Sequence, residues 1–261
     1  MNLDLSGKRA MVCGSTQGIG KAAAIELSLM GASITLVARD ENKLKQTLNE
    51  LQRASDQSHD FIVADFAAPD DLKAKVSAYL QQKRVHILVN NTGGPPAGPI
   101  LDADADAFIK AYTSHLICNH LLVQAVVPGM KAEQFGRIIN IISTSVKAPL
   151  KNMGVSNTTR SAVANWAKTL SLEVAPFNIT VNNVLPGATM TGRLESLMQG
   201  QARQSGRSYD EVKAETARQV PAGRIGDAHE VAAAIAFLAT PAASYINGIN
   251  IPVDGGRTPN L

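Results

Sequence analysis

Cysteine is scarce in this sequence, and the histidines show none of the patterns that bind a metal. The 261 residues include two cysteines, Cys13 and Cys118, and both lie in apolar runs. They are expected to be buried free thiols, which excludes a fold held together by disulfide bonds. The five histidines are scattered without the spacing of metal ligands, so the sequence predicts no metal site.

Long apolar runs and a strong excess of one charge are also missing. No stretch of about 18 uncharged apolar residues occurs, and Asp4 stands where a signal peptide has a basic and then apolar run. The protein is therefore expected to be cytoplasmic and to have no membrane partner. Lys and Arg outnumber Asp and Glu by 25 to 22, and a net charge of +3 is too small and too dispersed to predict a nucleic-acid partner.

Short apolar runs alternate with helical patterns along nearly the whole chain. Apolar residues make up 45% and charged residues 18%, which is typical of a globular protein with a buried core. Residues 9–13, 33–38 and 179–185 are among the predicted strands, and helices are expected over 41–55 and 106–130. Nearly continuous apolar strands separated by helices predict an α/β fold with a doubly wound parallel sheet covered on both faces.

No linker, repeat or low-complexity tract divides the chain, so one domain over residues 1–261 is predicted. The segment 188–223 is polar, helical in pattern and follows the last long strand. It is predicted to be a lid over a site, and a solvated surface excursion is the alternative. Its charged residues are Arg193, Arg203, Arg207, Lys213 and Arg218 together with Glu195, Asp210, Glu211 and Glu215. The mixture of signs favours a salt-bridged surface over a basic face for an anionic partner.

A glycine-rich turn, GSTQGIG, follows the first predicted strand and opens the first helix. Glycines allow backbone N–H groups to approach a pyrophosphate, and the helix N-terminus favours its negative charge. The turn therefore predicts a dinucleotide site. Its residues are Gly14, Ser15, Thr16, Gln17, Gly18, Ile19 and Gly20.

The end of the second predicted strand indicates which dinucleotide is bound. An acid at this position accepts the ribose 2′-hydroxyl of NAD, whereas an Arg accommodates the 2′-phosphate of NADP. Arg39 comes first and is followed by Asp40. The order favours NADP(H), and Asp40 leaves NAD(H) as the alternative.

Several motifs in order along the chain resemble the short-chain dehydrogenase/reductase family. They are GSTQGIG at 14–20, NNTG at 90–93, GRIIN at 136–140, VNNVLPG at 181–187 and VDGG at 253–256. Within that family the chain looks most like the 3-oxoacyl-carrier-protein reductases. The resemblance implies a single-domain Rossmann fold with a seven-stranded sheet, a homotetramer or dimer, and a small-molecule or acyl-thioester substrate.

The resemblance also assigns the rest of a cofactor site. Asp65 would hold the adenine with Phe66 beside it, and Asn91 and Gly93 would line the adenosine ribose and the sheet end. The nicotinamide side would be met by Pro186, Gly187 and Thr191.

The catalytic positions depart from the family pattern. The family uses a Tyr as acid, a Lys four residues later, a Ser on the neighbouring strand and an Asn on the preceding helix. Ser143 matches the Ser, but Ser156 stands at the Tyr position, Arg160 at the Lys position and His115 at the Asn position. A serine hydroxyl is a far weaker acid than a phenol, and Arg holds its charge at all working pH values.

Two hypotheses follow for these substitutions. In the first, the protein is an NADP(H)-dependent oxidoreductase with a non-standard site, in which Ser143 donates a hydrogen bond and either His115, oriented by Tyr112 and Asn119, or water supplies the proton. Arg160 shares a helix face with Ser156 and would bind the nicotinamide ribose or an anionic group. In the second, the chain is catalytically impaired and serves as a nucleotide-binding, ligand-binding or partner subunit. A structural role is the alternative for His115.

Overall fold

A parallel sheet of seven strands forms the centre of the computed structural model, which describes residues 1–54 and 56–260. The strand order is β3-β2-β1-β4-β5-β6-β9, and every pairing is parallel. The strands are β1 (Arg9–Cys13), β2 (Ser33–Ala38), β3 (Asp60–Val63), β4 (Ile87–Asn90), β5 (Gly136–Ile141), β6 (Ile179–Pro186) and β9 (Asn250–Val253). The predicted doubly wound parallel sheet is confirmed.

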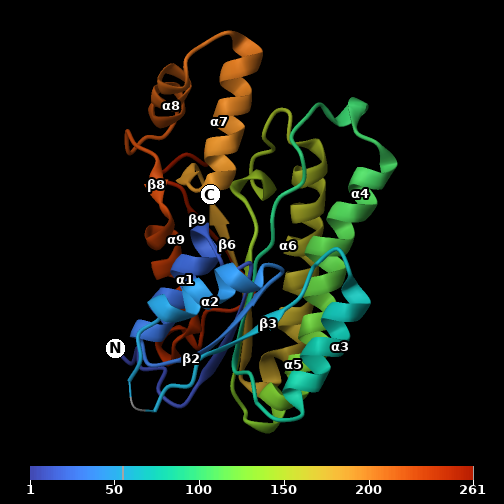
Figure 1. The fold of residues 1–261 in the computed structure, drawn as a ribbon, viewed down its shortest axis with the longest axis vertical. Coiled ribbons are helices and arrows are strands. Elements are labelled where there is room, and N and C mark those ends of the chain that lie inside the picture. Colours follow the sequence, from blue (N-terminus) through green and yellow to red (C-terminus); the bar gives the residue numbers. More distant parts are fainter. Residues whose placement is uncertain (55, 261) are drawn as a thin grey trace.

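Helices cover both faces of the sheet (Figure 1). One face packs against α1 (Gly18–Leu29), α2 (Glu41–Glu50) and α9 (Ala228–Ala239). The other packs against α3 (Pro69–Leu80), α5 (Cys118–Ala132) and α6 (Gly154–Val174). Alternation along β1 shows why both faces are apolar: Ala10 and Val12 point into the first core, and Met11 and Cys13 into the second.

Two helices differ from the expectation. The helix predicted over 41–55 ends at Glu50, because Leu51 leaves the helix in an extended conformation and buries its side chain; Ser55 lies outside the described residues. The helix predicted over 106–130 is divided into α4 (Ala105–Tyr112), a π-helical turn (Thr113–Ile117) and α5. A π turn inserts one extra residue per turn, so side chains after it are rotated from their α-helical positions.

The segment predicted as a lid is helical and has a small core of its own. It contains β7 (Thr189–Met190), α7 (Gly192–Ser205) and α8 (Tyr209–Arg218), and β7 pairs with β8 (Gly226–Asp227). The two helices extend beyond the sheet (Figure 1). Their buried contact consists of Met198, Ala202 and Val212.

Four asparagines form a hydrogen-bonded ladder across the sheet. The Asn90 amide donates to Asn140 at 2.9 Å, Asn140 donates to Asn183 at 2.9 Å, and Asn183 donates to Asn250 at 2.8 Å. The first three are buried, and the four stand opposite one another in the strand register. The ladder fixes the register of β4, β5, β6 and β9, because a slip of one residue would bury every amide unpaired.

Both cysteines are buried and free, as expected. None of the helices within 1–54 and 56–260 is long and apolar enough to cross a bilayer.

Candidate functional site

The glycine-rich turn between β1 and α1 packs so closely that its glycine positions have no room for side chains. Gly14 and Gly18 adopt positive φ angles of 58° and 54°, which favour glycine. A Cβ on Gly14 would stand 2.6 Å from Nδ2 of Asn91, and one on Gly20 would collide with the Gly14 carbonyl oxygen. The turn can therefore meet a ligand with main-chain atoms alone.

Two polar side chains hold this turn in place. The Asn91 amide donates to the carbonyl oxygens of Cys13 and Gly14, both at 3.3 Å. Ser15 is buried, and its Oγ accepts from the Val37 N–H at 3.1 Å. Asn91 was expected to line the adenosine ribose. Its side-chain amide positions the turn, and the expected contact of Asn91 with the ribose stays a prediction.

The N-terminus of α1 leaves donors available. Gln17 occupies the N-cap and makes no side-chain bond to the helix, so the first-turn N–H groups have no side-chain cap. Thr16 is half-buried and Gln17 is exposed beside them. Thr191 faces this end of the helix, since its methyl group lies 3.2 Å from the place of a Cβ on Gly18. Uncapped N–H groups and the helix dipole together favour a phosphate here.

Arg39 and Asp40, the two charged residues after β2, differ in their contacts. Asp40 caps α2, and its carboxylate accepts from the Lys43 N–H at 3.1 Å. Arg39 is exposed. The cation is therefore the group left to meet a ligand at this strand end, as the order of the two residues predicts.

The expected adenine contacts are only partly realised. Asp65 is half-buried after β3, and its carboxylate accepts from the Ala67 N–H at 2.9 Å. The Phe66 side chain is 8% exposed and belongs to the core between the sheet and α3. The Phe66 ring therefore belongs to the apolar core, and the placement of Phe66 beside Asp65 at the adenine stays a prediction.

The segment after β6 forms the opposite wall. Pro186 ends the strand, and a Cβ on Gly187 would meet Asp254 at 2.5 Å, so this turn packs closely on the C-terminal segment. Thr191 caps α7 by accepting from the Leu194 N–H at 3.3 Å. These contacts join the start of the lid to the glycine-rich turn.

The structure brings Ser156 and Arg160 together at the carboxyl end of β5, beside Ser143. Nε of Arg160 donates to Oγ of Ser156 at 3.2 Å, and Nη1 donates to the carbonyls of Ile142 at 2.8 Å and Ile141 at 3.1 Å. Oγ of Ser143 accepts from the Ser145 N–H at 3.1 Å. Nε and Nη1 of Arg160 are thus engaged by Ser156 and the strand end, and the expected contact of Arg160 with a ribose or an anionic group stays a prediction that falls to Nη2.

His115 lies in the π-helical turn and is 5% exposed, and its Nε2 has no hydrogen-bond partner among residues 1–54 and 56–260. Burial and the nearby Arg160 cation lower its pKa to about 3, against a smaller opposing effect of the Gly93 backbone. The imidazole is therefore neutral at pH 7. This finding contradicts the hypothesis that His115 is a charged proton donor near neutral pH.

The residues expected to orient His115 do not do so. Tyr112 is 43% exposed, and within the described chain neither Tyr112 nor Asn119 makes a side-chain hydrogen bond to it. The expectation assumed an uninterrupted α-helix, and the π turn changes which side chains share a face with His115.

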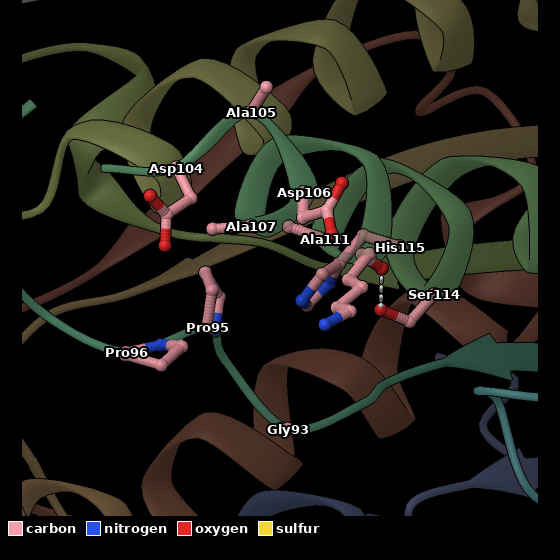
Figure 2. A pocket seen from close by; sticks show the side chains of 11 residues that line it. Gly93, Pro95, Pro96, Asp104, Ala105, Asp106, Ala107, Ala111, Ser114 and His115 are labelled. Atoms are coloured by element: carbon pink, nitrogen blue, oxygen red, sulfur yellow. Dashed lines mark hydrogen bonds between the residues drawn. The ribbon is translucent and has the colours of Figure 1, made fainter.

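His115 faces a cavity of about 630 Å³ between α4 and the loop after β4 (Figure 2). Gly93 and Pro95 line the loop side, and Lys110 and Ser114 are among the lining residues of the helical side. Gly93, which was expected at the cofactor, thus lies at the border of this cavity.

One site residue was missed from the sequence. Arg193 was assigned to the charged surface of the lid, but its Nη2 donates to the carbonyl of Pro95 at 2.5 Å. This bond brings the start of α7 to the loop after β4. The available signal was its place two residues after Thr191, in the segment assigned to the nicotinamide side.

Known proteins resemble the chain along nearly its whole length. A family model described as enoyl-(acyl carrier protein) reductase matches residues 14–258. The 3-oxoacyl-[acyl-carrier-protein] reductase FabG of Vibrio cholerae is 33% identical over 257 residues, 97% of this chain and 98% of that protein. The NADPH-dependent reductase BacG of Bacillus subtilis is 28% identical over 259 residues, 98% of this chain and all of that protein.

Solved structures agree with the sequence matches. The L-sorbose reductase from Gluconobacter frateurii, complexed with NADPH and L-sorbose, superposes with a TM-score of 0.93 at 30% identity, and the match covers both chains fully. The strand order, the glycine-rich turn and these matches lead to one assignment. The chain belongs to the short-chain dehydrogenase/reductase family and is similar to its 3-oxoacyl-carrier-protein reductases.

Proposed function

We propose that this protein is an NADP(H)-dependent oxidoreductase that interconverts a carbonyl and a hydroxyl group at a non-standard site. The observation that carries the proposal is the intact glycine-rich turn, which packs so closely on Asn91 and on the Gly14 carbonyl that it requires glycine, and which leads into the uncapped start of α1. Related proteins named as NADPH-dependent reductases support the choice of cofactor. NADP(H), when bound, supplies or takes up the hydride.

The residues of this chain fit that cofactor in three places. The uncapped N–H groups at the start of α1 suit a pyrophosphate. The exposed Arg39 suits a 2′-phosphate, because the neighbouring Asp40 is occupied in capping α2. Thr191 closes over Gly18 from the lid side.

Two serine hydroxyls are arranged to donate to a substrate oxygen. Oγ of Ser156 accepts from Arg160, and Oγ of Ser143 accepts from the Ser145 N–H. With these acceptor positions filled, the hydroxyl protons of both serines are free to bond a carbonyl oxygen. The Arg160 cation stabilises negative charge that develops on that oxygen, and water supplies the proton. The substrate would be a small carbonyl compound or an acyl thioester.

The first test is calorimetric titration of the protein with NADPH and NADH. We expect micromolar NADPH binding and much weaker NADH binding. Arg39→Ala removes the cation and should weaken NADPH binding by about ten- to a hundredfold while leaving NADH binding unchanged. Equal loss for both cofactors would show that Arg39 does not bind the 2′-phosphate.

A second candidate is a binding protein that performs no turnover. It is favoured by the neutral state of His115 at pH 7 and by the lack of a phenol at position 156. NADPH oxidation with a panel of ketones and oxoacyl thioesters separates the candidates. Steady oxidation that depends on the carbonyl compound supports the oxidoreductase, and binding without oxidation supports the binding protein.

We also propose that the protein assembles as a homodimer or homotetramer. Large apolar side chains are exposed on the long helices and the π turn: Ile109 is 63% exposed, Ile117 41% and Leu172 67%. Apolar exposure on adjacent helices favours a self-complementary contact. Light scattering coupled to gel filtration measures the assembly directly, and a monomer at micromolar concentration would contradict it.

A further inference from the structure

Two arginines from separate elements converge on Gly94. Nη2 of Arg160, on α6, lies 3.5 Å from the place that a Cβ on Gly94 would take. Nε and Nη2 of Arg193, at the start of α7, lie 3.6 and 3.7 Å from the same point. The missing side chain of Gly94 therefore leaves a space bordered by two guanidinium groups.

Neither guanidinium has an acid for a partner. Within residues 1–54 and 56–260, no carboxylate forms an ion pair with Arg160 or Arg193. Their acceptors are neutral: the carbonyls of Ile141, Ile142 and Pro95, and Oγ of Ser156. By contrast, Arg218 pairs with Glu215 and Arg224 with Glu230, although Arg203 and Arg207 form no ion pair in the described chain. The pair at Gly94 thus carries uncompensated positive charge.

Two donors that remain free face this space. Arg160 uses Nε and Nη1, and Arg193 uses Nη2. In the described chain, Nη2 of Arg160 and Nε of Arg193 have no acceptor, and both border the Gly94 position. Burial is the main cause that lowers the pKa of Arg160 to about 10, and the neighbouring charge of Arg193 lowers it further.

We propose that the space in front of Gly94 binds a permanent oxyanion of the substrate, a carboxylate or a phosphate, between Arg160 and Arg193. Guanidinium groups match these planar or tetrahedral oxyanions with paired hydrogen bonds. The anion offsets the repulsion of the two cations and takes up both free donors. Because Arg160 also contacts Ser156, the charged group lies close to the carbon that reacts. This arrangement favours short anionic oxo compounds over long neutral ones.

The inference rests on the proposed function for the identity of the ligand as substrate, but binding of the anion needs no cofactor. The probes are sodium acetate and sodium phosphate, each compared with sodium chloride at equal ionic strength in thermal unfolding. At about ten times the dissociation constant, we expect the midpoint to rise by about 3 °C with at least one of the two. The probe with the larger effect identifies the oxyanion.

Arg193→Gln tests the pair without disturbing the core, because Arg193 is exposed. The rise in the midpoint of thermal unfolding should be lost in this variant. Arg203→Gln is the matched control, since Arg203 is an exposed arginine on the same helix. The Arg203→Gln variant should keep the full rise in the unfolding midpoint.

Gly94→Ala tests the space itself. Its new methyl group would have no neighbour closer than 3.5 Å, so the variant should fold with unchanged stability in chloride. The methyl would stand where the oxyanion binds, and the rise should be lost. Gly98→Ala, in the same loop with open space around the Cβ, should keep it.

Three results would overturn the inference. The first is no rise with either probe. The second is an equal rise in Arg193→Gln, which would indicate the general stabilising effect of such salts. The third is loss of the rise at saturating NADPH, which would assign the arginine pair to the cofactor's pyrophosphate. A rise in a protein that fails to bind NADPH would support the anion site and contradict only the proposed function.

Discussion

A serine beside an arginine does different chemistry from a phenol beside an ammonium group. Arg160 donates to Ser156 and cannot lose its proton, so this pair supplies hydrogen bonds and positive charge but no acid of useful pKa. Charge stabilisation alone lowers a barrier when the hydride donor is well oriented. At the scale of single residues, the site is built to hold negative charge.

The buried His115 should make the stability of the protein depend on pH. The unfolded chain binds a proton at this residue near pH 6.5, whereas the folded protein does so only near pH 3. The unfolded state therefore binds more protons between these values, and the free energy of unfolding falls as the pH falls. Between pH 6.5 and 5, wild type should lose about 2 kcal/mol more than His115→Gln.

Urea unfolding at a series of pH values measures this difference. Burial also lowers the pKa values of His59 and His86, and both variants of the comparison retain these two residues. Their contribution cancels in the difference. If the free energy of unfolding changes in parallel with pH in wild type and His115→Gln, the imidazole is protonated in the folded protein as readily as in the unfolded chain.

At the scale of elements, the β1–α1 turn depends on glycine for its closure. Gly20→Ala would place a methyl group against the Gly14 carbonyl and within 2.7 Å of Nδ2 of Asn91. We expect the free energy of unfolding to fall by about 2 kcal/mol and NADPH binding to be lost. Chemical denaturation and calorimetry measure the two effects.

Gly129→Ala is the matched control for that substitution. Gly129 lies in α5 with nothing within 4 Å of its Cβ position. Replacing a helical glycine with open surroundings should raise stability by about 0.5–1 kcal/mol and leave cofactor binding unchanged. A similar loss of stability and of NADPH binding in Gly20→Ala and Gly129→Ala would show that the close packing of the turn is not the cause of that loss.

The sequence predicts elements better than it predicts contacts. Residues 33–38 form a strand with the expected bounds, because a run of buried β-branched and apolar residues has few alternatives. The π turn at Thr113–Ile117 was not foreseen, because a single π turn changes the apolar spacing over only a few residues of a long helical pattern. The meeting of Arg160 and Arg193 at Gly94 joins residues far apart in the chain, and no local pattern encodes it.

At the scale of the whole molecule, the scaffold should accept the family's usual chemistry. The triple variant Ser156→Tyr, Arg160→Lys and His115→Asn restores the Tyr, Lys and Asn of the resemblance. We expect carbonyl-dependent NADPH oxidation to rise at least about a hundredfold over wild type, because a positioned acid contributes that much. Steady-state assays with the carbonyl panel measure it.

The matched control carries Phe in place of the restored Tyr and keeps the other two substitutions. It lacks only the phenolic hydroxyl, so its rate should stay near that of wild type. No gain in the triple variant, despite NADPH binding, would mean that the lid or the Gly94 region blocks the substrate.

The packing of α1 on α9 has a consequence for how the protein is made. The first core is lined by residues of both helices, and the Asn ladder ends on Asn250. Residues synthesised first therefore remain without partners that are synthesised last, and the part of this face that α9 covers stays exposed until α9 has emerged. At ordinary rates of translation, this interval is on the order of ten to fifty seconds. Nascent chains of this protein should therefore depend on chaperones that shield apolar strands.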